Sequence, residues 1–393
     1  MLFWIQRNQK QRSMLMKITQ IRIESLAVPL PHPYHLSKEY GIFSTATPIV
    51  VAIDTDEGIT GYGECDPWPL FTGDSVESAG LVIAKHLAPI LIGKDPTNIN
   101  EIHRLMDAMI RNQHLAKSAL DMAVHDIIGK ALGVPVHTLL GGSRRDTMRC
   151  MWSIGGSTPE ESAQDVLAAK AAGYHGCMIK IGGPDYKLDA DRTRAVREAV
   201  GPDYPLIVDA NQGWDVDTAI RYWKRIRDCD IAFFEQPLQS WDVQGMAKIR
   251  RAIDIPLSAD EGVMTLQDAR NLIQAEAVDI FSIKVTKNGG ITPAKAICEF
   301  AAAHGVQVFF NSMIEEGITQ AASLQIAATC SNIVTTIGHA FFSPNRLQSD
   351  ISNYHTFLKP EEGTVYVPQG PGLGIEIDQD ALAGYRTGSI TVK

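Results

Sequence analysis

Cysteine is scarce in this sequence, and the few residues are scattered along it. There are six among 393 residues, namely Cys65, Cys150, Cys177, Cys229, Cys298 and Cys330. They form no CxxC pair and no cluster of the kind that builds zinc sites or disulfide frameworks. We therefore expect reduced thiols and a cytoplasmic protein.

Basic residues are also in deficit. The chain has 36 Lys and Arg against 45 Asp and Glu, a net charge of -9, and a pI near 5.7. Nucleic acids and anionic membranes attract basic surfaces, so we expect neither as a partner. We expect a small-molecule substrate instead, and a homo-oligomer as the assembled form.

A long hydrophobic run is missing at the N-terminus. The chain opens with apolar residues from Met1 to Ile5, but polar and basic residues follow at once from Gln6 to Arg12. This pattern has no hydrophobic segment of signal-peptide length. We expect residues 1–15 to be a leader that adds nothing to the fold, with Met16 an equally good start.

The remaining composition is that of a globular protein, 45% hydrophobic and 21% charged, long enough for two domains. Residues 16–142 combine a strand pair with helical spacing at 75–93, 98–111 and 115–132, which predicts an α+β domain. Strands and helices alternate over 143–345, from a first strand at 147–154 to an eighth at 332–336, which is typical of a parallel α/β fold. We expect the strand-and-turn segment 346–393 to return to the first domain.

Five charged residues stand at the polar ends of short apolar runs. In chain order they are Lys180, Asp209, Glu235, Asp260 and Lys284, spaced by about the length of one βα unit. Apolar runs of this length suit parallel strands buried on both faces, so each charge falls where its strand ends. In a parallel barrel those ends meet at one mouth, where active sites lie.

The three acids in this row predict a metal site. Asp209, Glu235 and Asp260 offer carboxylate oxygens with no histidine or thiol nearby, and this donor set suits Mg²⁺. Asn211 and Glu261 follow two of these acids closely. They either orient the metal ligands or are ordinary turn residues.

The two lysines predict acid/base chemistry. Lys180 and Lys284 lie one strand before and one strand after the acids, so a closed barrel places them on opposite sides of the metal and of a bound substrate carboxylate. Burial and nearby positive charge can lower the pKa of such a lysine until it acts as a general base. The metal would stabilise the enediolate that forms when the proton next to the carboxylate leaves. We expect Lys287, three residues on, to anchor the turn Asn288-Gly289-Gly290 instead.

At these residues the chain resembles the enolase superfamily, and within it the muconate lactonizing enzyme subgroup. The resemblance rests on segments 208–211, 234–237, 259–261, 283–290 and 313–315, with further matches at 116–123 and 368–374. It implies a modified (β/α)₇β TIM-like barrel with an α+β capping domain, and capping-domain loops around 31–43 and 67–74 that close over the substrate. The site residues that it implies are Asp209, Glu235 and Asp260 for Mg²⁺, Lys180 and Lys284 for acid/base catalysis, and Asn211, Glu261 and Glu315 for binding.

Two positions depart from the pattern of the family. The family usually has Lys-x-Lys on the second barrel strand, whereas this chain has Met178-Ile179-Lys180, which keeps the catalytic lysine and loses the first. An unusual substrate would fit that loss of positive charge. The segment from Phe309 to Met313 has no histidine, which disfavours the mandelate racemase branch. We expect His304 and His339 to be surface or core residues.

These features favour a magnesium-dependent racemase or epimerase that abstracts the proton alpha to the carboxylate of an amino-acid derivative, including proline-like or betaine-like acids. Two amines on opposite faces suit such a 1,1-proton transfer. A dehydratase or a muconate-type cycloisomerase would use the same lysine pair, and the sequence does not separate these reactions. A non-catalytic barrel is the rival from another class, and the two lysines count against it.

The lid segments contain four aromatic residues, Tyr40, Phe43, Trp68 and Phe71. They would either face an apolar or cationic group of the substrate or serve only in the packing of the lid.

Overall fold

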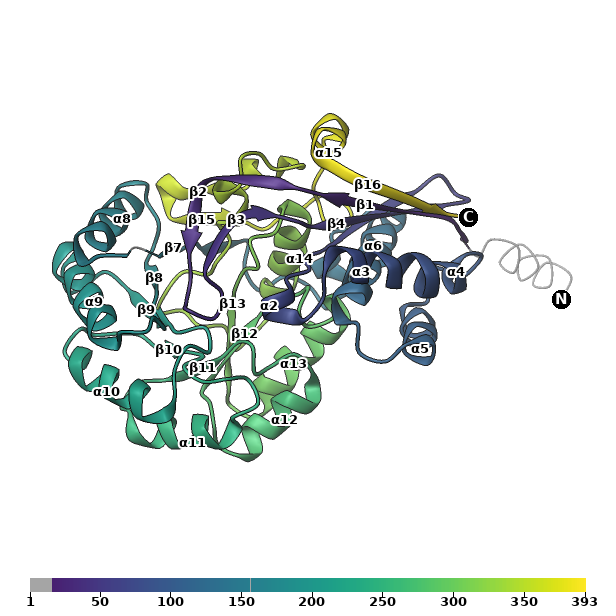
Figure 1. Cartoon of the computed structure of the whole chain (residues 1–393). Helices are drawn as coiled ribbons and strands as arrows, with labels where there is room; N and C mark the ends of the chain where they lie inside the picture. The colour runs from purple at the N-terminus through teal and green to yellow at the C-terminus, as the bar shows by residue number, and fades with distance from the viewer. Residues whose placement is uncertain (1–15, 156) are drawn as a thin grey trace, which may run out of the picture.

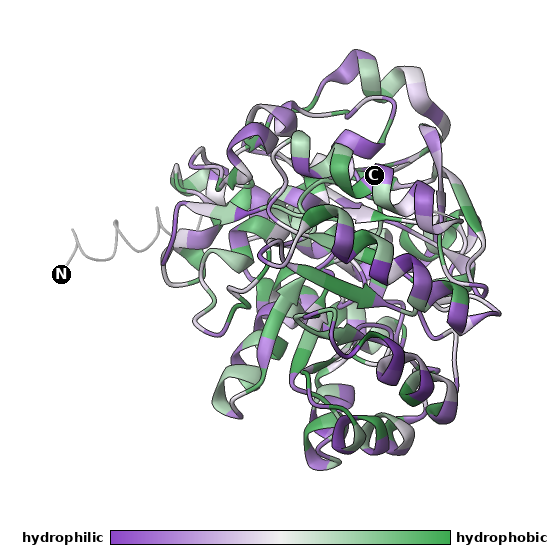
Figure 2. Ribbon diagram, turned by 90° about the vertical axis from the view of Figure 1, so that its left-hand side faces the viewer, coloured by the Kyte–Doolittle hydropathy of each residue, from purple (hydrophilic) through white to green (hydrophobic). Residues whose placement is uncertain are grey.

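An antiparallel sheet with its own helices lies beside a curled parallel sheet that is surrounded by helices (Figure 1). The computed structural model describes residues 16–393 except residue 156, so the predicted leader lies outside the described residues. Apolar residues follow the central strands, whereas the outer helices carry mixed colours (Figure 2). None of the described helices is long and apolar enough to cross a membrane.

The antiparallel sheet has the strand order β16-β1-β4-β5. Its strands are β1 (Ile18–Leu26), β4 (Ile49–Thr55), β5 (Thr60–Cys65) and β16 (Arg386–Val392). The last strand of the chain pairs with the first, with Ile21 opposite Val392, so the tail returns to the N-terminal sheet. The helices of this region are α3 (Val76–Val82), the π-helix η1 (Ile83–Leu87), α4 (Ala88–Leu91), α5 (Ile99–Met109), α6 (His114–Leu132) and α7 (Val136–Leu139). The segment expected to be one helix over 75–93 therefore contains a π turn.

Helix α6 packs directly on β5, and glycine makes this approach possible. A Cβ atom built at Gly63 would lie 1.9 Å from the carbonyl oxygen of Ala119, and one built at Gly61 would lie 2.2 Å from that of Ala123. Only residues without a side chain fit at these two positions. The core of this region is formed by apolar residues of β1, β4 and α6, including Ile21, Val51 and Leu120.

Two segments extend from this sheet over the mouth of the parallel sheet. One is the hairpin of β2 (Val28–His35) and β3 (Ile42–Ala46), and the other is the short helix α2 (Pro69–Thr72). The backbone N–H of Lys38 donates to the carbonyl of Gly182, and the Ser37 hydroxyl donates to that of Asn211. The turn of the hairpin is thereby fixed above the ends of two barrel strands.

The parallel sheet follows chain order from β7 to β13, with a helix after each strand. The strands are β7 (Trp152–Ile154), β8 (Cys177–Lys180), β9 (Leu206–Asp209), β10 (Phe234–Glu235), β11 (Leu257–Ala259), β12 (Ile280–Ile283) and β13 (Gln307–Phe310). The helices are α8 (Pro159–Ala171), α9 (Tyr186–Val200), α10 (Val216–Ile226), α11 (Val243–Ala252), α12 (Leu266–Gln274), α13 (Ile291–Ala303) and α14 (Gly317–Ala327). The expected TIM-like fold with an α+β cap is confirmed.

The expected first barrel strand, 147–154, is divided between two sheets. Its first half, β6 (Thr147–Arg149), belongs to a separate sheet with β14 (Leu358–Lys359) and β15 (Thr364–Tyr366), and only β7 joins the barrel. The rest of the tail contains the 3₁₀ turns η2 (Ser343–Arg346), η3 (Asn353–Thr356) and η4 (Pro360–Glu362), and helix α15 (Gln379–Tyr385).

The expected eighth strand, 332–336, is not a strand in the described structure. The segment makes an isolated parallel bridge between Ile333 and Val308, and a second bridge joins His339 to Cys150. Backbone hydrogen bonds at 2.9 Å join Val308 to Asn332 and to Val334. The side chain of His339 adds to them, because its Nδ1 accepts from the N–H of Phe310 at 3.0 Å and its Nε2 lies 3.0 Å from the carbonyl of Val334. Burial lowers the pKa of His339 to about 3, so it is a neutral core residue, as expected.

Candidate active site

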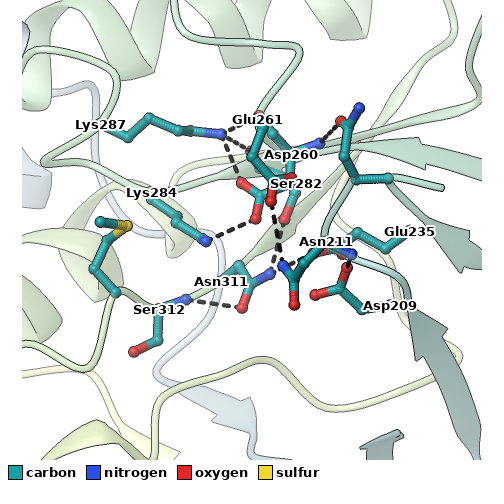
Figure 3. Close-up of polar contacts among 12 residues, drawn as sticks. Asp209, Asn211, Glu235, Asp260, Glu261, Ser282, Lys284, Lys287, Asn311 and Ser312 are labelled. Carbon is teal, nitrogen blue, oxygen red and sulfur yellow. Dashed lines mark hydrogen bonds and ion pairs between the residues drawn. The ribbon is translucent and has the colours of Figure 1, made fainter. Parts of the chain in front are cut away.

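The register of the parallel strands places the predicted charges side by side. Lys180 is the Cα partner of Asp209, and Asp209 is the partner of Glu235 on the next strand. Asp260 directly follows β11 and Lys284 directly follows β12. All five side chains are buried, and the strand register places them at one end of the sheet. Figure 3 shows four of them, Asp209, Glu235, Asp260 and Lys284.

The lysines neutralise two of the three acids. Lys180 Nζ is paired with Asp209 Oδ2, and Lys284 Nζ lies 2.6 Å from Asp260 Oδ2.

The sequence-based interpretation of Lys287 is wrong. This fully buried residue donates to Asp260 Oδ1 at 2.8 Å and to the carbonyl of Ser282 at 3.0 Å, and so helps to hold Asp260. Asn288 fixes the turn itself, because its Oδ1 accepts from the N–H of Lys284 and its Nδ2 donates to the carbonyl of Val263.

These ion pairs also decide the pKa values of the lysines. Burial alone would lower the pKa of Lys180, but the charge of Asp209, with Tyr34 and Glu235, outweighs burial and the pKa is raised. The pKa of Lys284 is likewise raised, because Asp260 and Glu261 outweigh its burial. The expected fall in the pKa of the two lysines is therefore absent when only the charges of the protein act on them, because each amine faces a carboxylate.

The oxygen atoms between the lysines fit a divalent cation. Three buried oxygens in this place have neither a hydrogen-bond partner nor an ion-pair partner among the described residues: Asn211 Oδ1, Glu235 Oε2 and Glu261 Oε2. Burial and the charges of Asp209 and Asp260 raise the pKa of Glu235 well above its usual range, and the same causes raise the pKa of Glu261 to about 7. Unpaired hard oxygens with excess negative charge match the donor set of Mg²⁺.

The acidic side chains nevertheless do not converge on a common point as metal ligands would. In the part of the chain that the structure describes, no three Asp, Glu, His or Cys side chains already converge as a ligand set. The reason lies in the ion pairs, since the carboxylates of Asp209 and Asp260 are turned toward lysine ammonium groups on opposite sides of Glu235. A cation bound here would compete with those ammonium groups for the same oxygens.

Neighbouring amides hold the acids in place. Asn311 Nδ2 donates to Glu235 Oε1 at 2.6 Å (Figure 3). Gln236 Oε1 accepts from the N–H of Asp260 at 2.9 Å. The backbone N–H of Asn211 donates to Asp209 Oδ1 at 2.9 Å, and its Nδ2 lies 3.3 Å from Glu261 Oε1. The sequence reasoning missed Asn311 and Gln236, although both directly follow a barrel strand, a position that should have marked them.

A small cavity of about 30 Å³ lies between the two lysines, and lid aromatics close it. It is lined by Lys180, Lys284, Met178, Asn211 and Asn311 from the barrel, and by Tyr34, Leu36, Tyr40, Trp68 and Phe71 from both predicted lid segments. The Phe71 ring centroid lies 4.1 Å from Lys284 Nζ, and the Tyr40 hydroxyl donates to Glu261 Oε1 at 2.8 Å. This volume suffices for about one or two water molecules. A substrate therefore requires the lid to move.

Glu315 lies away from this cavity. Its carboxylate accepts hydrogen bonds from the Ser312 hydroxyl at 2.8 Å and from the side-chain amide of Gln320. Its neighbours Met313 and Ile314 line the cavity instead, and Ile314 has a φ of 67°, which is unusual for a β-branched residue. Glu315 thus shapes the loop that borders the cavity.

A curled parallel barrel whose strand ends carry two lysines and three acids, beneath an α+β cap, defines a member of the enolase superfamily. Residues 18–141 match the family described as "Mandelate racemase / muconate lactonizing enzyme, N-terminal domain", and residues 161–381 match "Enolase C-terminal domain-like". The chain therefore belongs to the mandelate racemase/muconate lactonizing enzyme family. The resemblance identified from the sequence, including the muconate lactonizing enzyme subgroup, is confirmed.

Its relatives are isomerases. The chain is 36% identical to an N-succinyl-L-Arg/Lys racemase of Bacillus cereus, over 93% of this chain and 97% of the relative. It is 31% identical to muconate cycloisomerase 1 of Rhodococcus opacus, over 93% and 98%. The crystal structure of a dipeptide epimerase from Cytophaga hutchinsonii, complexed with Mg and the dipeptide D-Ala-L-Val, superposes with a TM-score of 0.89 at 30% identity, covering 96% of this chain and 100% of that one. The expected enzyme class, an isomerase with a racemase or epimerase as the main interpretation, is confirmed.

Proposed function

We propose that this protein is a magnesium-dependent racemase or epimerase that moves the α-proton of an N-acylated amino acid or dipeptide. One observation carries the proposal: Lys180 and Lys284 line the same cavity from opposite sides, with strands β9, β10 and β11 between the strands that present them. A proton can therefore leave from one face of a carbon held in this cavity and arrive at the other. The racemase and epimerase relatives support the same reaction.

Each residue of the site has a role in this proposal. Asp209, Glu235 and Asp260 would hold Mg²⁺, which when bound supplies positive charge to the substrate carboxylate and to the charge that develops as the α-proton leaves. The Nζ of one lysine removes the proton, and the Nζ of the other delivers one to the opposite face. Asn211 and Glu261 orient the acids, and the lid aromatics exclude water.

The test follows the α-proton of each stereoisomer in deuterated water, with Mg²⁺ present. Lys180→Ala should stop exchange from one stereoisomer and leave exchange from the other measurable, and Lys284→Ala should do the reverse. Full racemisation or epimerisation should fall by about 10² to 10⁴ in both variants, the usual worth of a positioned acid or base. Lys248→Ala, which removes an exposed lysine of α11, is the control and should behave as the wild type.

A muconate-type cycloisomerase is the second candidate, because a relative with that activity aligns over nearly the full length. In that reaction exchange would depend on one lysine only, and a cyclised product would appear. Near-wild-type turnover by one lysine variant would refute the racemase or epimerase, and near-wild-type turnover by both variants would refute both candidates. Turnover with a cyclised product would refute racemisation alone.

A further inference from the structure

The guanidinium of Arg346, at the end of η2, is enclosed by three aromatic rings beside a second and larger cavity. Its central carbon lies 3.9 Å from the ring centroid of Tyr34, 4.4 Å from that of Trp152 and 5.4 Å from that of Phe342. Its Nη2 donates to the carbonyl of Ser153, whereas its Nε is buried without a hydrogen-bond partner. The side chain is only partly exposed, so its charge is largely removed from water.

Arg346 has no carboxylate partner within 4 Å among the described residues. Four acids line the larger cavity, and three of them are already engaged. Glu161 is the capping-box acid of α8, Asp378 caps α15, and Asp350 accepts from the N–H of Gly317 and from Ser352. Only Asp165 remains, and it acts on Arg346 without forming an ion pair. A desolvated cation without a counter-ion is costly, and a bound anion would offset that cost.

The larger cavity adjoins the lysine cavity. It has a volume of about 1120 Å³ and is lined by β2 of the lid, by β7 and α8, and by the segment around η2. Tyr34 and Ser153 line both cavities, and their hydroxyl groups are hydrogen-bonded to each other. A molecule whose α-carbon lies between the lysines would pass these two residues to reach Arg346.

We propose that Arg346 binds a second carboxylate of the substrate, remote from the reacting carbon. The inference rests on the proposed function and narrows it to amino-acid derivatives with two carboxylates. The second carboxylate can stand at the end of the N-acyl chain or on the amino-acid side chain, and the guanidinium recognises it in the same way, by charge-assisted hydrogen bonds from Nε and a terminal nitrogen. The N-succinyl group in the name of the Bacillus cereus relative carries a carboxylate of the first kind.

The experiment compares matched substrates by α-proton exchange in deuterated water with Mg²⁺. N-succinyl-valine is paired with N-butanoyl-valine, and N-butanoyl-glutamate with N-butanoyl-glutamine. Within each pair only the remote carboxylate is replaced by a neutral group. The wild type should prefer the dianion by about 10- to 100-fold in kcat/KM in one pair, the usual worth of a charge-assisted hydrogen bond. That pair also tells which position Arg346 recognises.

Three variants separate recognition from structure. Arg346→Met should remove the preference and leave kcat/KM for the neutral member within about threefold, whereas Arg346→Lys, which keeps the charge, should retain part of it. Asp165→Asn, which removes the acid whose charge acts on Arg346, should increase the preference. Thermal unfolding of each variant checks that it folds. If Arg346→Met does not fold, the comparison of the substrate pairs with the wild-type protein still tests the preference.

Three outcomes would overturn the inference. Equal activity of the wild type toward both members of each pair would refute it while leaving the proposed function intact. An equal loss on both members in Arg346→Met would assign the residue to packing between Tyr34 and Trp152. Exchange with none of the four compounds would refute the proposed function, and this inference with it.

Discussion

Acidic side chains that have no basic partner among the described residues gather where the antiparallel region meets α14, and their protonation should control stability. Glu64, at the end of β5, is fully buried, and its two oxygens accept from the N–H of Glu316 at 2.8 Å and of Thr319 at 2.9 Å. Asp66 and Glu315 lie close enough to influence its charge. Removing the titration of Glu64 by Glu64→Gln is therefore an informative perturbation.

The direction of the effect follows from the pKa. Burial raises the pKa of Glu64 from 4.5 to about 7, against the lowering effect of the two backbone N–H donors. The native state thus binds a proton more tightly than the unfolded chain. The stability that this tighter proton binding at Glu64 contributes is fully present below about pH 4.5 and is lost as the pH rises toward 7. At about 1.4 kcal/mol per pKa unit, the loss is at most about 3.5 kcal/mol.

The assay is urea unfolding of the metal-free protein between pH 4.5 and 8. For the wild type, the free energy of unfolding should contain a component that falls between pH 5 and 7, and Glu64→Gln should lack it because glutamine does not titrate. The difference between the two proteins isolates Glu64 from other groups. Glu57→Gln, in an exposed turn, is the control. Parallel pH profiles for wild type and Glu64→Gln, or a difference that grows in the wild type's favour above pH 5, would refute the argument.

Three further predictions follow from the site and its support. Asp260→Asn should weaken Mg²⁺ binding, measured by calorimetry, without unfolding the chain. Chelation should abolish turnover, and added Mg²⁺ should restore it. Full activity in strong chelator would contradict the metal site. Lys287→Met leaves Asp260 with one fewer buried partner, so we expect about 3 kcal/mol or more of destabilisation in urea unfolding, and a loss below 1 kcal/mol would show that the contact is unimportant. Gly63→Ala should lower the melting temperature, because the added Cβ would meet Ala119, whereas Gly384→Ala in α15 meets no atom within 4 Å and should be neutral or stabilising. Equal melting temperatures for these two glycine variants would contradict the packing argument.

The sequence alone determined the barrel and the charged row at its mouth. An apolar run that ends in a charge can be buried only as a strand with that charge at its exit, and chain order becomes sheet order when each strand is followed by a helix of similar length. Lys180, Asp209, Glu235, Asp260 and Lys284 were therefore predictable as neighbours. The resemblance to the family added that the α+β domain caps the barrel and that two of its segments form the lid.

The tertiary structure alone decided which partners those charges meet. Lys287 appeared to belong to a local turn, but its ammonium group reaches Asp260, 27 residues away. The eighth barrel segment carries a strand-like sequence, yet it makes only an isolated bridge to Val308, and the side chain of His339 adds hydrogen bonds beside it. Arg346 and Glu64 gave no signal in the sequence, because their surroundings come from segments far apart in the chain: Arg346 meets Tyr34, and Glu64 meets Glu316. Periodicity reports which face of an element is buried, whereas the partner of a buried charge depends on how separate elements pack together.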